Sequence, residues 1–505
     1  MCGLRQIRES GRRELPRRGS LKLQNPRSPT ADVLTFCSSV LIEIMKPVHL
    51  RKIAALLLIV LVGSVGAVLA QSKKDKKRAQ ELVLAGDKAF RARNYRDATA
   101  SYGQAILIVP NNSYAHYWKG VAHYNLKENA DALREFDIAL SQGFKPIEVY
   151  RVRWYLHYEA KEYEAALSDV LKAIEIDPDN IDFKKGMGEI YYAQGRYADS
   201  LQTFQAIVLK QPKDGDVYYN IARAQAAMGN AVEQGNAAQA ALSNNTRMIG
   251  ESYFLLADSL QKQAKLDAAI DNYQRAIAAK PENYQAYKNL ADVYRSMSNF
   301  KAAIEVAKKA ILKFPDDGSF YTDVSWYYSL DNEPARAAEA ARSATKLLPN
   351  QYLGYTNLCR ALNDLKDYSG AVAACNTALK LNPGDGETYF YLARAYDLAG
   401  RRADATPLYT KAVVGLEEFV KRNPDYSDGY YLLGNAYYAD NQTDKAIESY
   451  KKVISLNPGF SRARFNLGMV YLQKKDKTSA MEQYSALLPI DPALAGRLKA
   501  EIDKS

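Results

Sequence analysis

Apolar and small side chains recur every 34 residues along most of the chain, beginning at residue 79. The first half of most copies places an aromatic at its fourth residue. Helical spacing then brings an apolar residue next to a small one, as in Leu290 with Ala291 and Leu433 with Gly434. The second half supplies a matching alanine, so each copy is predicted to form two helices packed as a hairpin. The recurring aromatics are Tyr150, Tyr218, Tyr253, Tyr287, Tyr321, Tyr355, Tyr389 and Tyr430. The recurring alanines are Ala98, Ala132, Ala166, Ala269, Ala303, Ala337, Ala371, Ala405, Ala446 and Ala480.

Prolines close most copies, because proline lacks an amide hydrogen and ends a helix. They are Pro178, Pro212, Pro281, Pro315, Pro349, Pro383, Pro458 and Pro492. The copies therefore begin at residues 79, 113, 147, 181, 215, 250, 284, 318, 352, 386, 427 and 461. An Asn or Asp after the proline, such as Asn180, is expected to cap the next helix. The turn inside each copy falls at residues that tolerate a left-handed backbone. These are Gly195, Gly229, Asn299, Asp367 and Gly400.

This unit resembles the tetratricopeptide repeat, whose spacing is clearest in Tyr437, Ala446, Tyr450 and Pro458. The resemblance covers residues 79–492 in about twelve copies. It implies an all-α fold, a right-handed superhelical solenoid of stacked antiparallel helix pairs, with the first helices lining a concave groove. Residues 493–505 place Leu494, Leu498 and Ile502 four residues apart and are predicted to cap the open end of the stack.

Two copies depart from the pattern. The fifth has Gln234 and Gly235 where the alanine contact belongs and has no closing proline, so it is predicted to be a flexible joint or an irregular second helix. The tenth is seven residues longer, about two helical turns, which keeps its apolar face in register. We expect that extension, residues 411–423, to pack beside the eleventh copy, with partner docking as the alternative. The array is thus predicted to divide into units 1–5 (79–246), units 6–10 (250–424) and units 11–12 (427–492).

The N-terminal leader combines three segments. Residues 45–70 have a basic start, the apolar run of residues 53–70 and small residues before Gln71, as in a secretory signal peptide. The run is also long enough to be an uncleaved membrane anchor. Residues 1–44 form a basic leader that we expect to be a start-site artefact, with Met45 the true start. The alternative is a disordered basic arm, and residues 71–78 form a basic linker.

Both alternatives for residues 45–70 export the repeats. The style of signal suggests a bacterial envelope. The repeats are therefore expected in the periplasm, or outside the cytoplasm on an inner-membrane anchor.

The positive charge is confined to the leader. Residues 1–78 carry 16 Lys and Arg against 5 Asp and Glu, whereas the remaining residues carry 52 of each. A nucleic-acid-binding protein would place basic residues on its folded surface. Nucleic acid is therefore not an expected partner, and membrane contact is expected only through residues 53–70 if they are not cleaved.

Catalytic and metal-binding patterns are weak. His116, His123 and His157 could come together as a metal or acid–base site, but the last two occupy a position that is aromatic in other copies, which favours packing. Cys359 and Cys375 sit in the two helices of the ninth copy; two buried thiols are favoured, and a disulfide is allowed in an oxidising compartment. The sequence carries no CxxC, HExxH or nucleotide-binding fingerprint. We therefore predict no enzymatic activity, cofactor or metal.

The groove is the remaining candidate site. The resemblance directs first-helix positions two, five, nine and twelve of each copy towards it, and rigid aromatics beside charges suit peptide binding. We predict a protein–protein interaction scaffold that binds a partner segment there; a self-assembling structural array is the alternative. The predicted groove residues are Tyr114, Tyr117, Tyr124, Arg151, Tyr155, Tyr158, Lys185, Tyr192, Tyr219 and Arg223.

Overall fold

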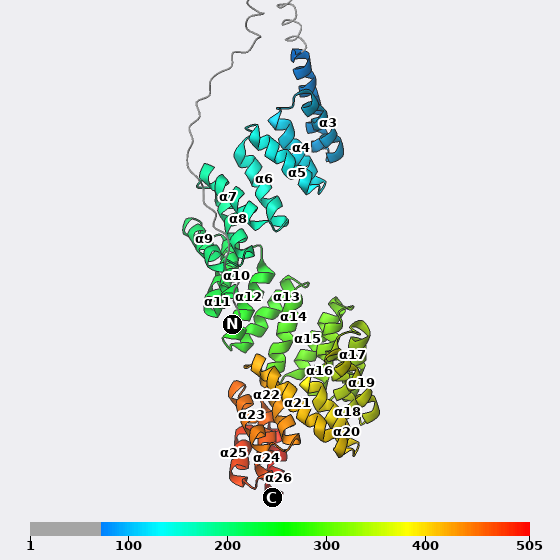
Figure 1. Ribbon diagram of the computed structural model, residues 1–505. Helices are drawn as coiled ribbons and strands as arrows, with labels where there is room; N and C mark the ends of the chain where they lie inside the picture. The colour runs from blue at the N-terminus through cyan, green and yellow to red at the C-terminus, as the bar shows by residue number, and fades with distance from the viewer. Residues whose placement is uncertain (1–71) are drawn as a thin grey trace, which may run out of the picture. The chain divides into compact units, whose positions relative to one another are not determined.

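A computed structural model describes residues 72–505, and every regular element in that range is helical (Figure 1). Residues 72–91 form a helix that precedes the labelled ones. The predicted segments 1–44 and 45–70 lie outside the described residues. The labelled helices are α3 Tyr95–Ile108, α4 Ser113–Asn125, α5 Asn129–Ser141, α6 Pro146–Glu159, α7 Tyr163–Ile176, α8 Ile181–Ala193, α9 Tyr197–Lys210, α10 Gly215–Ala227, α11 Ala231–Ser243, α12 Ile249–Lys262, α13 Leu266–Ala279, α14 Tyr284–Ser296, α15 Phe300–Lys313, α16 Gly318–Leu330, α17 Pro334–Leu347, α18 Tyr352–Asp364, α19 Tyr368–Leu381, α20 Gly386–Leu398, α21 Arg402–Arg422, α22 Ser427–Ala439, α23 Thr443–Leu456, α24 Ser461–Gln473, α25 Lys477–Leu487 and α26 Pro492–Lys504.

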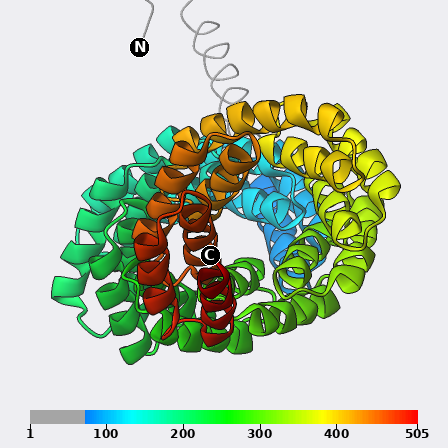
Figure 2. The same ribbon diagram turned by 90° about the horizontal axis from the view of Figure 1, so that it is seen from below.

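The chain forms two compact units, of which the first ends at Lys145 and the second runs from Pro146 to Ser505. In each unit successive helices pair as hairpins, with the two helices of a copy in direct contact. Seen along the view of Figure 2, the helices of the second unit follow one another around a curve. The all-α solenoid predicted from the 34-residue period is therefore confirmed. No helix of the described residues is long and apolar enough to cross a membrane.

Small residues in the first helix make room for an aromatic from the second helix. A methyl group on Gly434 would lie 2.7 Å from the ring of Tyr450, and one on Gly188 would lie 2.7 Å from that of Phe204. Both aromatics are almost fully buried. Real carbon atoms do not approach this closely, so glycine at this position sets the spacing within the hairpin.

The turns inside the copies need one residue with positive φ. Gly195, Gly229 and Gly400 have φ of 75°, 80° and 77°, as predicted. The assignment of Asn299 and Asp367 to this role is wrong. Positive φ falls one residue earlier, on Ser298 and Lys366, while Asn299 and Asp367 accept hydrogen bonds as the N-caps of α15 and α19. Where glycine is missing, a non-glycine residue takes the left-handed conformation at a cost of about 1–2 kcal/mol.

The fifth copy is regular despite its sequence. In α11, the buried Gln234 side chain donates from Nε2 to the backbone oxygen of Leu255 at 2.7 Å and to Oδ2 of Asp258 at 2.8 Å. A methyl group on Gly235 would lie 2.4 Å from Oγ of Ser259. The expectation of an irregular helix is therefore wrong, since Gln234 and Gly235 fit the close approach of α12. These contacts tie the fifth copy to the sixth where the sequence predicts a flexible joint.

The long tenth copy packs as expected. Helix α21 runs for 21 residues, and its buried Val413, Leu416 and Val420 join a core with α22. Gly415 lies against backbone at the start of α20: a methyl group there would be 2.7 Å from the amide nitrogen of Gly386. The absence of side chains at both glycines therefore lets α21 pass beside α20.

The C-terminal helix caps the stack as predicted. Ala495, Leu498 and Ile502 of α26 are fully buried. The Leu498 side chain packs against Gly468 of α24, where a methyl group would lie 2.6 Å away. Leu494 is partly buried in the same cluster.

The ninth copy is cross-linked. Cys359 of α18 and Cys375 of α19 form a disulfide with a Cα–Cα distance of 5.3 Å, so the expectation of two free thiols is wrong. They occupy the positions that Gly434 and Tyr450 hold in the eleventh copy. The disulfide thus replaces the pairing of a small residue with an aromatic.

Candidate functional site

The first helices of the third to sixth copies, α6, α8, α10 and α12, carry aromatic and charged side chains on a shared face. Arg223 of α10 lies at its centre. Its Nη1 donates to Oε2 of Glu189 at 3.0 Å and to Oδ1 of Asn220 at 2.8 Å. The guanidinium lies 4.1 Å from the ring centroid of Tyr192 and 5.6 Å from that of Tyr219. These contacts fix a cation between two aromatic faces, which is a stable geometry for arginine.

The charge states on this face are well defined. Burial opposes the charge of Arg223, but Glu189 and nearby tyrosines outweigh burial and raise its pKa. Burial raises the pKa of the Tyr219 hydroxyl, and burial followed by Glu189 raises that of Tyr158. Near neutral pH Arg223 is therefore charged, while the hydroxyls of Tyr219 and Tyr158 are neutral.

A hollow of about 450 Å³ lies next to Arg223. It is lined by Tyr219, Arg223, Glu251, Phe254, Leu255, Lys280, Glu282, Asn283, Tyr284 and Gln285. Lys280 pairs with Glu251 through an Nζ–Oε1 distance of 2.5 Å. The lining thus offers aromatic rings together with both signs of charge, and its volume is in the range of pockets that accept small ligands or side chains.

The predicted groove residues end in the fifth copy. They therefore omit the residues of α12 that line the hollow. Glu251 and Phe254 occupy positions two and five of the sixth copy; position five is the one that selected Tyr219 in the fifth. Extending that rule by one copy would have found both residues. Lys280 and Tyr284 come from the turn after α13 and the start of α14, for which the rule gives no signal.

Other predicted residues of the second unit take local partners. Lys185 pairs with Asp214, the N-cap of α10, at 2.6 Å. Arg151 pairs with Glu148 at 3.3 Å and is largely exposed. Tyr155 and Tyr158 both pack edge-on against Trp154, with ring centroids 5.8 and 6.2 Å away. Lys185 therefore also holds the start of α10, whereas Tyr155 and Tyr158 pack within α6.

The three predicted groove residues of the first unit differ in their burial and in their contact partners. Tyr117 is only 9% exposed and stacks on Phe144 with ring centroids 4.4 Å apart, so its assignment to the groove surface is wrong and it is a core residue. The Tyr114 hydroxyl bonds to Asp87, 3.2 Å from Oδ2. Tyr124 lies beside Lys127, whose Nζ is 5.5 Å from the ring centroid. These three residues belong to the first compact unit, whereas Arg223 belongs to the second.

The three histidines each bind their own carboxylate. His116 is buried, with Nδ1 2.6 Å from Oε2 of Glu135 and Nε2 3.1 Å from the backbone oxygen of Pro110. His123 contacts Glu128 and His157 contacts Glu162, with Nδ1–Oε2 distances of 2.6 and 2.7 Å. Both ring nitrogens of His116 are therefore engaged, which removes it from any metal site shared with the other two.

Carboxylates nevertheless gather beside His123. Ligand-type atoms of His123, Glu128 and Asp131 lie within 4.8 Å of one another. Asp131 also pairs with Arg134, and the cluster lies at the N-terminal end of α5, where the helix dipole is positive. Both features oppose the binding of another cation.

Glu135 holds a buried charge in the first unit. Burial would raise its pKa, but hydrogen bonds from Lys119 and His116 outweigh burial and lower it. The distance from Lys119 Nζ to Oε1 of Glu135 is 2.6 Å.

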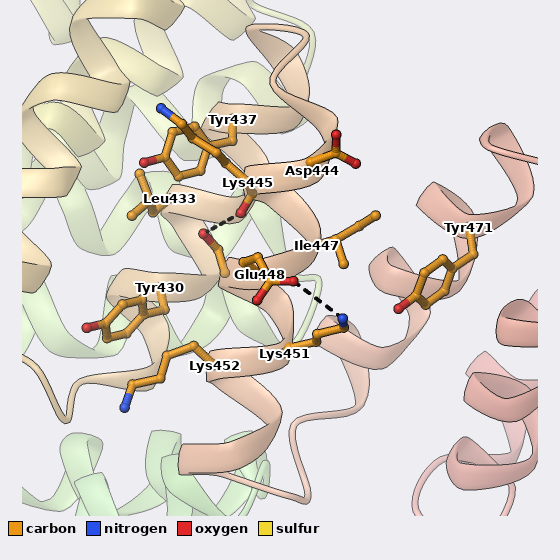
Figure 3. Close-up of a pocket in the computed structure, with 11 residues that line it drawn as sticks. Tyr430, Leu433, Tyr437, Asp444, Lys445, Ile447, Glu448, Lys451, Lys452 and Tyr471 are labelled. Carbon is orange, nitrogen blue, oxygen red and sulfur yellow. Dashed lines mark hydrogen bonds and ion pairs between the residues drawn. The ribbon is translucent and has the colours of Figure 1, made fainter.

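A larger hollow of about 730 Å³ lies over α22 and α23, with Tyr430 and Tyr437 near Lys452 and Lys445 (Figure 3). Lys452 lies over Tyr430 with its Nζ 5.8 Å from the ring centroid. The same pairing of a base with the fourth residue of the copy recurs elsewhere, so it is a packing device of the repeat. Further examples are Lys172 with Tyr150, Arg275 with Tyr253, and Lys411 with Tyr389.

Helical hairpins stacked in sequence order, with their first helices forming a shared face, define an α-solenoid repeat protein. The chain belongs to the tetratricopeptide repeat family, whose profiles match residues 83–145, 157–226, 254–320, 327–386, 392–459 and 431–495. The unmatched stretch 227–253 contains α11, in which Gln234 and Gly235 replace the usual contact.

The chain is 26% identical over 142 residues to small glutamine-rich tetratricopeptide repeat-containing protein 2 of Saccharomyces cerevisiae, covering 28% of this chain and 40% of that protein. It is 24% identical over 203 residues to a DnaJ homolog subfamily C member 7 homolog of Schizosaccharomyces pombe, covering 39% and 42%. A solved tetratricopeptide repeat protein from Parabacteroides merdae is similar with a TM-score of 0.42 and 15% identity, over 51% of this chain and 98% of that chain. The chain thus spans less than half the length of these two curated relatives.

Proposed function

We propose that this protein is a non-enzymatic scaffold that binds an extended segment of a partner protein across α8, α10 and α12. Proteins of this family commonly mediate protein–protein interaction. The observation that carries the proposal is the Arg223 cation held between Tyr192 and Tyr219 beside the hollow lined by Phe254. Aromatic and arginine side chains that are already held in place bind a peptide with little further loss of side-chain entropy.

The test is crosslinking in the native cell, with partners of the full chain identified by mass spectrometry. Tyr219→Ala and Arg223→Gln should each remove partners recovered by the wild-type protein. Tyr368→Ala is the matched control, because Tyr368 is also half-buried but begins the second helix of its copy. Recovery of the same partners by Tyr219→Ala, Arg223→Gln and the wild type would exclude this face as the binding site.

We further propose that the repeats are exported to the bacterial cell envelope, in the periplasm or on an inner-membrane anchor. Two features support this: the signal-like residues 45–70, and the disulfide between Cys359 and Cys375, a bond that persists in oxidising compartments. Amino-terminal sequencing of the native protein, combined with cell fractionation, tests the proposal. Recovery of the chain from the cytosol with free thiols at both positions would contradict it.

A further inference from the structure

The eleventh and twelfth copies contact the seventh and eighth within the second unit. Asp428, at the start of α22, pairs with Arg295 near the end of α14, 133 residues away. Arg462, at the start of α24, donates to the backbone oxygen of Leu330 at the end of α16, 132 residues away. Both contacts join copies that are four apart, and both place the beginning of a first helix on the end of another. This equal offset is what successive turns of one superhelix produce.

Two more contacts accompany them. Nδ2 of Asn457 donates to the backbone oxygen of Ser296 at 3.3 Å. The guanidinium of Arg462 lies 5.3 Å from the ring centroid of Phe300. We call the four contacts made by Asp428, Asn457 and Arg462 the clasp.

Arg295 is the most enclosed member of the clasp. Its side chain is 10% exposed, and that of Asp428 is 18% exposed. Arg295 also pairs with Asp292 at 2.7 Å and lies 4.9 Å from the ring centroid of Trp326. One cation is thus shared by carboxylates from both sides of the contact, so that removal of Asp428 would leave Arg295 with only its local partners.

The curvature that brings these ends together has a local cause. Between the seventh and eleventh copies, side chains of α18 bond directly to the neighbouring first helices. Asn357 Nδ2 donates to the backbone oxygen of Thr322 in α16 at 2.9 Å, and Asn363 Nδ2 donates to that of Tyr391 in α20 at 2.9 Å. Such bonds hold the first helices close together on the inner side, which tightens the turn.

First helices within this turn carry buried side chains that contact one another. Arg360 and Tyr391 are 8% and 9% exposed, with the guanidinium 4.6 Å from the ring centroid. Arg360 also pairs with Glu387. Arg360 is at position nine of the ninth copy and Glu387 at position two of the tenth, both groove positions, and the two side chains pair with one another.

We propose that the clasp is an intramolecular autoinhibitory contact: the eleventh and twelfth copies shut the groove of copies seven to ten, leaving α8, α10 and α12 as the face open to a partner. All four contacts are polar or cation–π, so they can separate without exposing an apolar core. Opening the clasp would extend the accessible groove into copies seven to ten. This consequence for binding rests on the proposed function, whereas the clasp itself does not.

Hydroxyl-radical footprinting of the full chain tests the clasp without any ligand. Asp428→Arg places a second cation against Arg295. Arg462→Gln removes the guanidinium that contacts the backbone oxygen of Leu330 and the ring of Phe300. Each should raise oxidation of Trp326 about twofold, because local opening exposes a half-buried ring, and should increase the radius of gyration. Trp118 and Trp154 lie outside the turn and serve as internal controls.

Asp364→Arg is the matched control variant. It breaks the pair of Asp364 with Arg394, 3.0 Å apart, which joins adjacent copies and does not span the turn. The proposal is overturned if Trp326 oxidation and the radius of gyration stay at wild-type values in Arg462→Gln and Asp428→Arg. It is also overturned if Asp364→Arg raises Trp326 oxidation and the radius of gyration as much as the two clasp variants do.

Circular dichroism confirms that each variant is folded. If Asp428→Arg unfolds, the result for Arg462→Gln decides. A negative result would leave binding at Arg223 untouched, since that is measured by partner recovery.

Discussion

Replacing Cys359 and Cys375 by alanine removes the cross-link within the ninth hairpin, and the size of the effect follows from the loop that it closes. The two residues are 16 apart in sequence and fully buried. For a loop of this length the chain-entropy estimate gives about 3 kcal/mol of stabilisation, by restricting the unfolded chain. The double substitution should therefore lower the local free energy of opening of α18 and α19 by about that amount.

Native-state hydrogen exchange of the full chain is the appropriate assay, because a repeat array opens in parts and a single melting transition averages over them. A loss of about 3 kcal/mol corresponds to amide exchange in α18 and α19 that is faster by roughly two orders of magnitude. Dithiothreitol should produce a similar change in the wild-type protein and none in the double variant.

A second variant separates the cross-link from packing. Cys359→Gly with Cys375→Tyr restores the small and aromatic pair seen at Gly434 and Tyr450. It should slow exchange relative to the double-alanine variant and be insensitive to dithiothreitol. If reduction leaves exchange of α18 and α19 in the wild type unchanged, the disulfide does not stabilise this hairpin and the reasoning fails.

Three other changes test packing and charge. Gly415→Ala should destabilise the second unit by about 1–3 kcal/mol in urea unfolding, since the new methyl group would meet the backbone at Gly386, whereas Gly496→Ala, with nothing within 4 Å, should not destabilise it. Leu498→Ala should cost about 2–5 kcal/mol at the C-terminal cap and speed hydrogen exchange in α24 first; protection there equal to the wild type would contradict the capping role. The lowered pKa of Glu135 means that its stabilisation is present above its unfolded pKa of about 4.3 and is lost as pH falls through the folded value. Glu135→Gln should therefore flatten the acid-side loss of stability of the first unit, measured by thermal unfolding at several pH values.

Most of the fold was predictable because its determinants act within one copy. Proline stops, N-caps such as Asn180 and the fit of Gly434 to Tyr450 all involve residues within 34 positions of one another. The wrong predictions either placed a feature one residue too late or did not include the contact partner of a residue. The left-handed residue is Ser298 rather than Asn299, because the cap and the turn are adjacent and both favour short polar side chains.

The site was predictable only in part. Tyr192, Tyr219 and Arg223 do share a face, as the positional rule predicts. Tyr117 obeys the same rule but is buried, because Phe144 from the end of the second copy covers it. Burial of a given position depends on the next segment of chain, which a rule applied one copy at a time does not include.

The sequence by itself determined the repeat, the hairpin, the caps and the C-terminal helix, because helix propensity, capping and small-to-aromatic fit are short-range. The disulfide, the fit of Gln234 against α12 and the contact of Arg295 with Asp428 were decided only by the tertiary structure. The last depends on small rotations that accumulate over four copies before two charges 133 residues apart can meet. No sequence pattern within one copy predicts this accumulated rotation.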